Sequence, residues 1–203
     1  MLMSTWLAAI LLFAFSTSFT PGPNNLLLIT SGAKFGLART WRHILGISFG
    51  FPLMIAVIAF FLGAVFQALP WLHALLNVVG AAYLLYLTWK ILMASGAVER
   101  GQVGQPIGFV EAALFQWVNP KAWVMATGAI AAYTTPAGFG LEVALIVLVF
   151  ACVGFASSLT WAAGGSLLAR FLHTPGRMRA FNIVLGLMLL ASIVPILLAA
   201  APS

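Results

Sequence analysis

Residues 19–28 read Phe-Thr-Pro-Gly-Pro-Asn-Asn-Leu-Leu-Leu and interrupt an otherwise apolar run at 6–29. Because a proline lacks a backbone N–H and clashes with the carbonyl group one turn back, Pro21 and Pro23 predict a break in a helix. In lipid, the backbone groups freed by a break must be satisfied by protein or by a polar cavity. The two asparagines that follow make this break a candidate binding site. A simple proline kink, or a helix end followed by a polar loop, is the alternative.

The composition is that of an integral membrane protein. The chain has 203 residues, 63% hydrophobic and 6% charged, and its mean hydropathy is +1.11. Soluble domains have about 45–50% apolar and about 25% charged residues. A membrane-spanning helix needs about 20 apolar residues, so the length allows six such helices with short connections.

Six apolar stretches predict six transmembrane helices, at 4–31, 44–66, 72–93, 107–133, 141–168 and 181–198. The hydrophilic stretch 94–106 divides this single transmembrane domain into a first repeat at about 1–93 and a second at about 107–203. Eight of the nine Lys and Arg residues fall in the connections after spans one, three and five, if Lys90 near the end of span three is counted with the connection that follows it. Since cytoplasmic loops are rich in Lys and Arg, both termini are expected in the periplasm. A basic patch for nucleic acid or anionic lipid is a less simple explanation, and nucleic acid is not expected as a partner.

A second interruption, Asn119-Pro120-Lys121, lies inside span four. Three spans per half is an odd number, so the second half must be inserted upside down relative to the first. Paired broken helices in inverted halves are typical of a transporter binding site near the membrane midplane. The fold expected is therefore an all-α polytopic membrane protein with six transmembrane helices in two inverted three-helix repeats, helices one and four being interrupted.

The first break has the chemistry of a carboxylate site. Pro23 suits the first residue of a new half-helix, where its missing N–H costs nothing. The N–H groups of Asn24, Asn25 and Leu26 would then be free at the positive end of a helix dipole. The asparagine amides add donors for a carboxylate and acceptors for an ammonium group. Alternatively, the asparagines only cap the helix and pack on its neighbours.

Lys121 is the most informative residue of the second break. An ionised lysine near the middle of a span costs about 2.5–3.5 kcal/mol on insertion scales, and a helix N-terminus disfavours a cation. These two penalties predict an anion that offsets them, either a substrate carboxylate or Glu111. The alternative is that the side chain extends to the membrane interface. Glu111 and Glu142 both fall near span ends, so no proton-carrying group is identified.

An enzyme is not expected. The stretch Gly46-Ile-Ser48-Phe-Gly50 matches the G-x-S-x-G pattern of hydrolases, which requires a strand–turn–helix and a His/acid partner. In a membrane helix the same glycines predict a close packing face, as do Gly32 with Gly36 and Ala162 with Ser166. His43, His73 and His173 have no metal-ligand spacing, so neither a metal nor a cofactor is expected. A channel or ion/metal exporter, and a membrane subunit without transport activity, remain alternatives.

Three motifs resemble those of the LysE/RhtB family of amino-acid exporters: T-P-G-P-N-N at 20–25, G-A-A-Y-L-L-Y-L-T-W-K at 80–90 and F-Q-W-V-N-P-K at 115–121. The resemblance covers essentially the whole chain and is greatest to the branch that exports cysteine, O-acetylserine and related small neutral amino acids. It implies a multi-pass protein of the bacterial inner (plasma) membrane that exports small amino acids or their derivatives using the proton-motive force. The two breaks supply the expected substrate-binding residues, and the resemblance implies a functional role for the same residues. They are Pro21, Gly22, Pro23, Asn24, Asn25, Asn119, Pro120 and Lys121.

The partners expected are a small amino-acid substrate, protons as the coupling ion and the lipid bilayer, and a homo-oligomer is compatible with this interpretation. Some members of the family carry an acidic residue in span two. Here residues 47–53 contain none, which leaves the coupling ion open.

Overall fold

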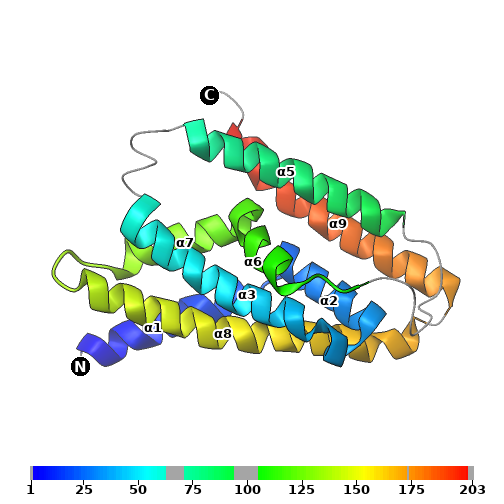
Figure 1. The fold of residues 1–203 in the computed structure, drawn as a ribbon, viewed down its shortest axis with the longest axis horizontal. Helices are drawn as coiled ribbons and strands as arrows, with labels where there is room; N and C mark the ends of the chain where they lie inside the picture. Colours follow the sequence, from blue (N-terminus) through cyan, green and yellow to red (C-terminus); the bar gives the residue numbers. More distant parts are fainter. Residues whose placement is uncertain (1, 63–70, 94–104, 173, 201–203) are drawn as a thin grey trace.

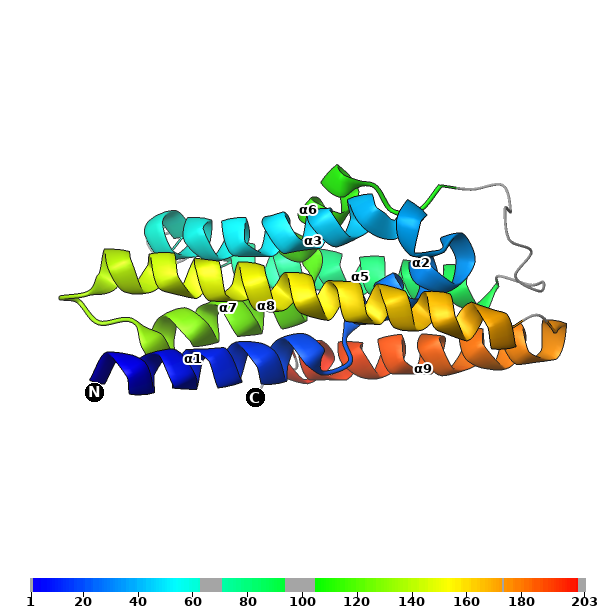
Figure 2. The same ribbon diagram turned by 90° about the horizontal axis from the view of Figure 1, so that it is seen from below.

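The computed structural model describes residues 2–62, 71–93, 105–172 and 174–200, and every regular element in these ranges is helical. The predicted all-α class is confirmed for this part of the chain. The helices lie broadly along one common direction and form a bundle (Figure 1; Figure 2). In chain order they are α1 (Leu2–Phe19), α2 (Pro23–Phe35), α3 (Leu37–Val57), the π-helical turn η1 (Ile58–Leu62), α5 (Trp71–Leu92), α6 (Phe109–Val118), α7 (Pro120–Tyr133), α8 (Phe139–Leu168), the 3-10 turn η2 (Ala169–Phe171) and α9 (Pro175–Ala200).

Two helical segments in the described ranges, Leu37–Phe61 and Phe139–Phe171, are long and apolar enough to cross a membrane. The pair α1 and α2 would make a third span if its two halves, bent by 56°, are counted together. The predicted bounds of span three agree with α5 to within one residue. Helix α3 begins seven residues before the predicted start of span two, and α9 begins six residues before that of span six. Hydropathy marks the lipid-embedded part of a helix, and these helices continue into polar residues beyond it. The predicted linker falls mostly outside the described residues.

The connection between α2 and α3 is a single residue, Gly36, rather than the connection at 32–43 that the predicted spans leave between them. Gly36 has φ +76°, a left-handed conformation that glycine adopts without steric cost. The chain therefore enters α3 at Leu37, and His43 lies inside that helix. His43 is buried, with its Nδ1 atom 3.1 Å from the Ser31 hydroxyl oxygen of α2. The predicted spans leave His43 just before the start of span two, whereas the structure places it inside α3, where it helps to join the two helices.

Glycines allow two pairs of helices to approach closely. A Cβ atom at Gly32 would lie 2.1 Å from the Ala162 carbonyl oxygen, and one at Gly165 would lie 2.1 Å from that of Ile29, so α2 and α8 meet backbone to backbone. Gly46 and Gly50 of α3 face α6, where a Cβ atom at each would lie 2.4 Å from the Phe109 carbonyl oxygen and 2.5 Å from the Ala113 Cα atom, respectively. The predicted packing faces are confirmed at Gly32, Gly46 and Gly50, and at Ala162 and Ser166, which face Gly32, whereas the close contact at Gly165 was not predicted. They are not confirmed at Gly36, which has no neighbour within 4 Å.

The Ser48 hydroxyl, central to the hydrolase-like pattern, donates to the Ile44 carbonyl oxygen one turn earlier in α3 at 2.8 Å. Ser48 therefore lies within a continuous helix and not at the strand–turn–helix elbow that this motif requires.

Two apolar clusters surround the helix breaks. One joins α1, α3, α7 and α8 around Phe150, and the other joins α2, α5, α6 and α9 around Leu84 and Leu189. Helices α5 and α9 pack on each other at one edge of the bundle (Figure 1). The two breaks are thereby held inside the bundle by apolar packing on both sides.

Candidate functional site

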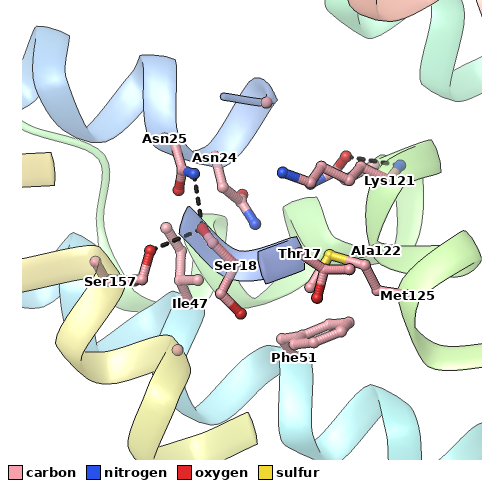
Figure 3. Close-up of a pocket in the computed structure, with 14 residues that line it drawn as sticks. Thr17, Ser18, Asn24, Asn25, Ile47, Phe51, Lys121, Ala122, Met125 and Ser157 are labelled. Atoms are coloured by element: carbon pink, nitrogen blue, oxygen red, sulfur yellow. Dashed lines mark hydrogen bonds between the residues drawn. The ribbon is translucent and has the colours of Figure 1, made fainter. Parts of the chain in front are cut away.

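The two helix breaks, about 100 residues apart in the sequence, meet at one pocket (Figure 3). Helices α1, α2, α3, α7 and α8 all contribute to its wall. Its apolar side is formed by Phe51, Met125, Ile47 and Ala122, which come from α3 and α7. The lining residues are Thr17, Ser18, Gly22, Asn24, Asn25, Ile47, Phe51, Asn119, Lys121, Ala122, Met125, Gly154, Ser157 and Ser158.

The first break begins a new half-helix as predicted. Gly22 is the N-cap of α2 and Pro23 occupies the first helical position, where its missing N–H costs nothing. The N–H groups of Asn24 and Asn25 lie in the first turn, where a helix offers no carbonyl partner. The expectation that Leu26 also has a free N–H is wrong, since it donates to the Gly22 carbonyl oxygen at 3.0 Å.

The end of α1 is closed by side chains from three other helices. Asn25 Nδ2 donates to the carbonyl oxygens of Ser18 and Thr20, at 2.9 and 2.8 Å. Ser157 Oγ donates to the Ser18 oxygen at 2.7 Å, as Figure 3 shows, and Lys121 Nζ donates to the Thr20 oxygen at 2.6 Å. The last carbonyl groups of a helix have no partner within it and form the negative end of its dipole. These donors therefore stabilise an interrupted helix end inside the bundle.

The second break is capped by its own asparagine. Asn119 is 2% exposed and its Oδ1 atom accepts from the Lys121 N–H at 3.2 Å, with Pro120 at the first helical position. An asparagine N-cap of this kind is typically worth about 1 kcal/mol. The Asn119 Nδ2 group makes no hydrogen bond to the described residues.

The ammonium group of Lys121 lies at the meeting point of the two breaks. Besides the Thr20 carbonyl oxygen, it donates to the Thr20 hydroxyl at 2.9 Å. The proposed pairing with Glu111 is wrong within the described structure: Glu111 is exposed in the first turn of α6, and no ion pair joins it to Lys121. The negative end of the α1 dipole replaces it. An ammonium group has three donors, so one remains for a ligand.

Asn24 is held by Gln116 of α6, a residue that sequence reasoning missed. Asn24 Nδ2 donates to Gln116 Oε1 at 2.8 Å, and Gln116 Nε2 donates back to Asn24 Oδ1 at 3.2 Å. Gln116 is fully buried and also donates to the Ala112 carbonyl oxygen. This amide pair fixes the start of α2 against the fourth predicted span. A glutamine in an apolar run, three residues before Asn119, was the available signal.

Five of the eight predicted site residues line the pocket: Gly22, Asn24, Asn25, Asn119 and Lys121. The three prolines, Pro21, Pro23 and Pro120, do not line it, and Pro23 and Pro120 instead set the starts of the half-helices. Four hydroxyl residues that were not predicted also line the pocket: Thr17, Ser18, Ser157 and Ser158. Their signal was weak, because single hydroxyls are common in membrane helices and usually bond to their own backbone.

The pocket has the polarity to hold a zwitterion. The described lining residues include one ammonium group and no carboxylate. Lys121 and the Asn119 amide offer donors for a carboxylate beside the N-terminal turn of α2. The Asn25 Oδ1 atom makes no hydrogen bond to the described residues and offers an acceptor for an ammonium group. No group of three described His, Cys, Asp or Glu residues is arranged to hold a metal ion.

Comparison with known proteins gives a consistent result. A family model described as "LysE type translocator" matches residues 15–198. The cysteine/O-acetylserine efflux protein of Escherichia coli (strain K12) is 34% identical over 189 residues, which cover 91% of this chain and 94% of that protein. The protein of the same name from Salmonella typhimurium (strain LT2) is 33% identical over 187 residues, covering 90% and 93%. No solved structure matches the chain.

Proposed function

The chain belongs to the LysE type translocator family. We propose that it is a secondary transporter that exports small amino acids or their derivatives across the bacterial inner membrane. The observation that carries the proposal is the pocket at which both helix breaks meet, with one ammonium group and no carboxylate among its described lining residues. Relatives that span nearly the same length are named as cysteine/O-acetylserine efflux proteins.

The substrate carboxylate binds between Lys121 and the start of α2. A Cβ atom added at Gly22 would lie 3.1 Å from Lys121 Nζ, so the ammonium group is beside the N-cap of this half-helix. A carboxylate there would meet the positive end of the α2 dipole and the unused donor of Lys121 together. The substrate ammonium group would be accepted by Asn25 Oδ1.

The transport cycle that we propose uses two inverted repeats of three spans each. Three features of the packing support this arrangement. Span two (α3) packs on span five (α8), and span three (α5) packs on span six (α9). Span one (α1 and α2) packs on span five, just as the first half of span four (α6) packs on span two. Such exchanged contacts are expected of halves related by a two-fold axis in the membrane plane. Rocking of one half against the other around the pocket would then alternate its access.

Both termini are proposed to be periplasmic, on the distribution of Lys and Arg among the connections. A reporter enzyme that is active only in the periplasm should be active when fused to the C-terminus. A fluorescent reporter that matures only in the cytoplasm should remain dark at the same position. The reverse pair of results would contradict the orientation.

Export is tested in intact cells loaded with dipeptides that release one amino acid inside. Cells that contain the protein should release serine, cysteine or O-acetylserine faster than matched cells that lack it, and a protonophore should abolish the difference if the proton-motive force drives it. A protein with Asn25 and Lys121 both replaced by alanine, checked for insertion, serves as the control. Equal release of every amino acid with and without the protein would overturn the exporter assignment.

A further inference from the structure

Two adjacent serines of α8, Ser157 and Ser158, line the pocket and differ in their hydrogen bonds. Both are buried, at 2% and 3% exposure. The Ser157 hydroxyl donates to the Ser18 carbonyl oxygen and so belongs to the structure that closes the end of α1. The Ser158 hydroxyl makes no hydrogen bond with any described residue. The two serines thus share a helix and a pocket but only one has a partner.

Four described helical serines, Ser16, Ser18, Ser158 and Ser166, make no hydrogen bond through the hydroxyl, and of these four only Ser158 is a buried residue. Thr160, two residues later in the same helix, donates to the Ala156 carbonyl oxygen at 2.8 Å, and Ser48 and Thr88 do the same with the residue four positions back. The residue four positions before Ser158 is Gly154, which also lines the pocket and adds no side chain there. Although Ser158 is a buried residue, its hydroxyl oxygen is not sealed off as a buried unpaired atom, so a group in the pocket can reach it and supply the missing hydrogen bond.

We propose that Ser158 is a specificity-determining residue that hydrogen-bonds the side chain of the transported amino acid. This inference rests on the proposed function and adds the class of substrate: a small amino acid with one hydrogen-bonding group on its side chain. A serine hydroxyl both donates and accepts, so it fits a hydroxyl, a thiol or an ester carbonyl. Phe51 and Met125 add an apolar part to the wall, and beside Lys121 the described lining residues hold no charge that could pair with a charged side chain.

The test compares the export of serine with that of alanine, which lacks only the side-chain hydroxyl. Cells are loaded with serine-containing and alanine-containing dipeptides, and initial release rates are measured at equal amounts of inserted protein. Ser158→Ala should lower serine export by about three- to tenfold, the effect of one neutral hydrogen bond. Alanine export should change by less than about twofold, because alanine offers Ser158 no partner.

Ser157→Ala is the matched control, since it removes the neighbouring hydroxyl from the same pocket. It should lower both rates by the same factor, because its partner is the α1 backbone and not the substrate. Ser158→Cys replaces the hydroxyl with a somewhat larger thiol, which is only a weak donor and acceptor, and should also reduce the ratio of serine to alanine export. An unchanged ratio in both Ser158 variants would overturn this role. Wild-type cells that release alanine but not serine faster than cells without the protein would also overturn this role, whereas wild-type cells that release no amino acid faster would overturn the proposed function.

Discussion

Replacing Lys121 by glutamine is expected to reduce export by about 10- to 100-fold, the effect of losing a hydrogen bond from a charged group. Lys121 supplies the ammonium group of the pocket, and it also donates to both oxygens of Thr20 at the end of α1. Glutamine retains a donor but no charge, so the attraction for a substrate carboxylate is lost. The measurement is the initial rate of amino-acid release from dipeptide-loaded cells, normalised to the amount of inserted protein.

Arg179→Gln is the control for this variant, because it removes an exposed positive charge outside the pocket and should leave export near the wild-type rate. Gly22→Ala provides an independent check of the same side chain. Its Cβ atom would lie 2.6 Å from Lys121 Cδ, at the flexible end of a side chain that can move, so export should fall while thermal stability changes little. Wild-type export by inserted Lys121→Gln protein would mean that this lysine serves only the end of α1.

Gly165→Ala is expected to destabilise the protein by about 3 kcal/mol or more, at the upper end of the usual cost of overpacking. Its Cβ atom would lie 2.1 Å from the Ile29 carbonyl oxygen and 2.8 Å from the Ile29 Cα atom. These are backbone atoms of α2, so no side-chain rotation relieves the clash and α2 must move away from α8. The apparent melting temperature in detergent and the yield of monodisperse protein should both fall.

The adjacent residue, Gly164, is a matched control for this substitution. A Cβ atom there has no neighbour within 4 Å, so Gly164→Ala should be neutral or stabilise the helix by about 0.5–1 kcal/mol. If Gly165→Ala and Gly164→Ala gave equal melting temperatures, the backbone contact between α2 and α8 would not exist as described.

The sequence alone was sufficient to predict the structural features that depend on composition or on a few neighbouring residues. The membrane class follows from composition, and the breaks follow from prolines placed beside a glycine or an asparagine. The start of α2 at Pro23 and the Asn119 cap of α7 both lie where these residues predicted them. Helix ends were less predictable, as at Leu37 and Pro175, because polar residues outside the lipid continue a helix without changing its hydropathy signal.

The partners of the site residues were decided only by the tertiary structure. Asn24 and Gln116 are 92 positions apart, and Lys121 and Thr20 are 101 positions apart. In a soluble protein an apolar stripe would indicate which face of each helix is buried. Lipid is as apolar as the protein interior, so apolar residues do not mark the buried face of the membrane helices here. The sequence therefore determined that the chain breaks at Pro21–Asn25 and at Asn119–Lys121. Only the packing of α2 on α8 and of α3 on α6 decided that the two breaks share one pocket, and that Ser158 lies in its wall.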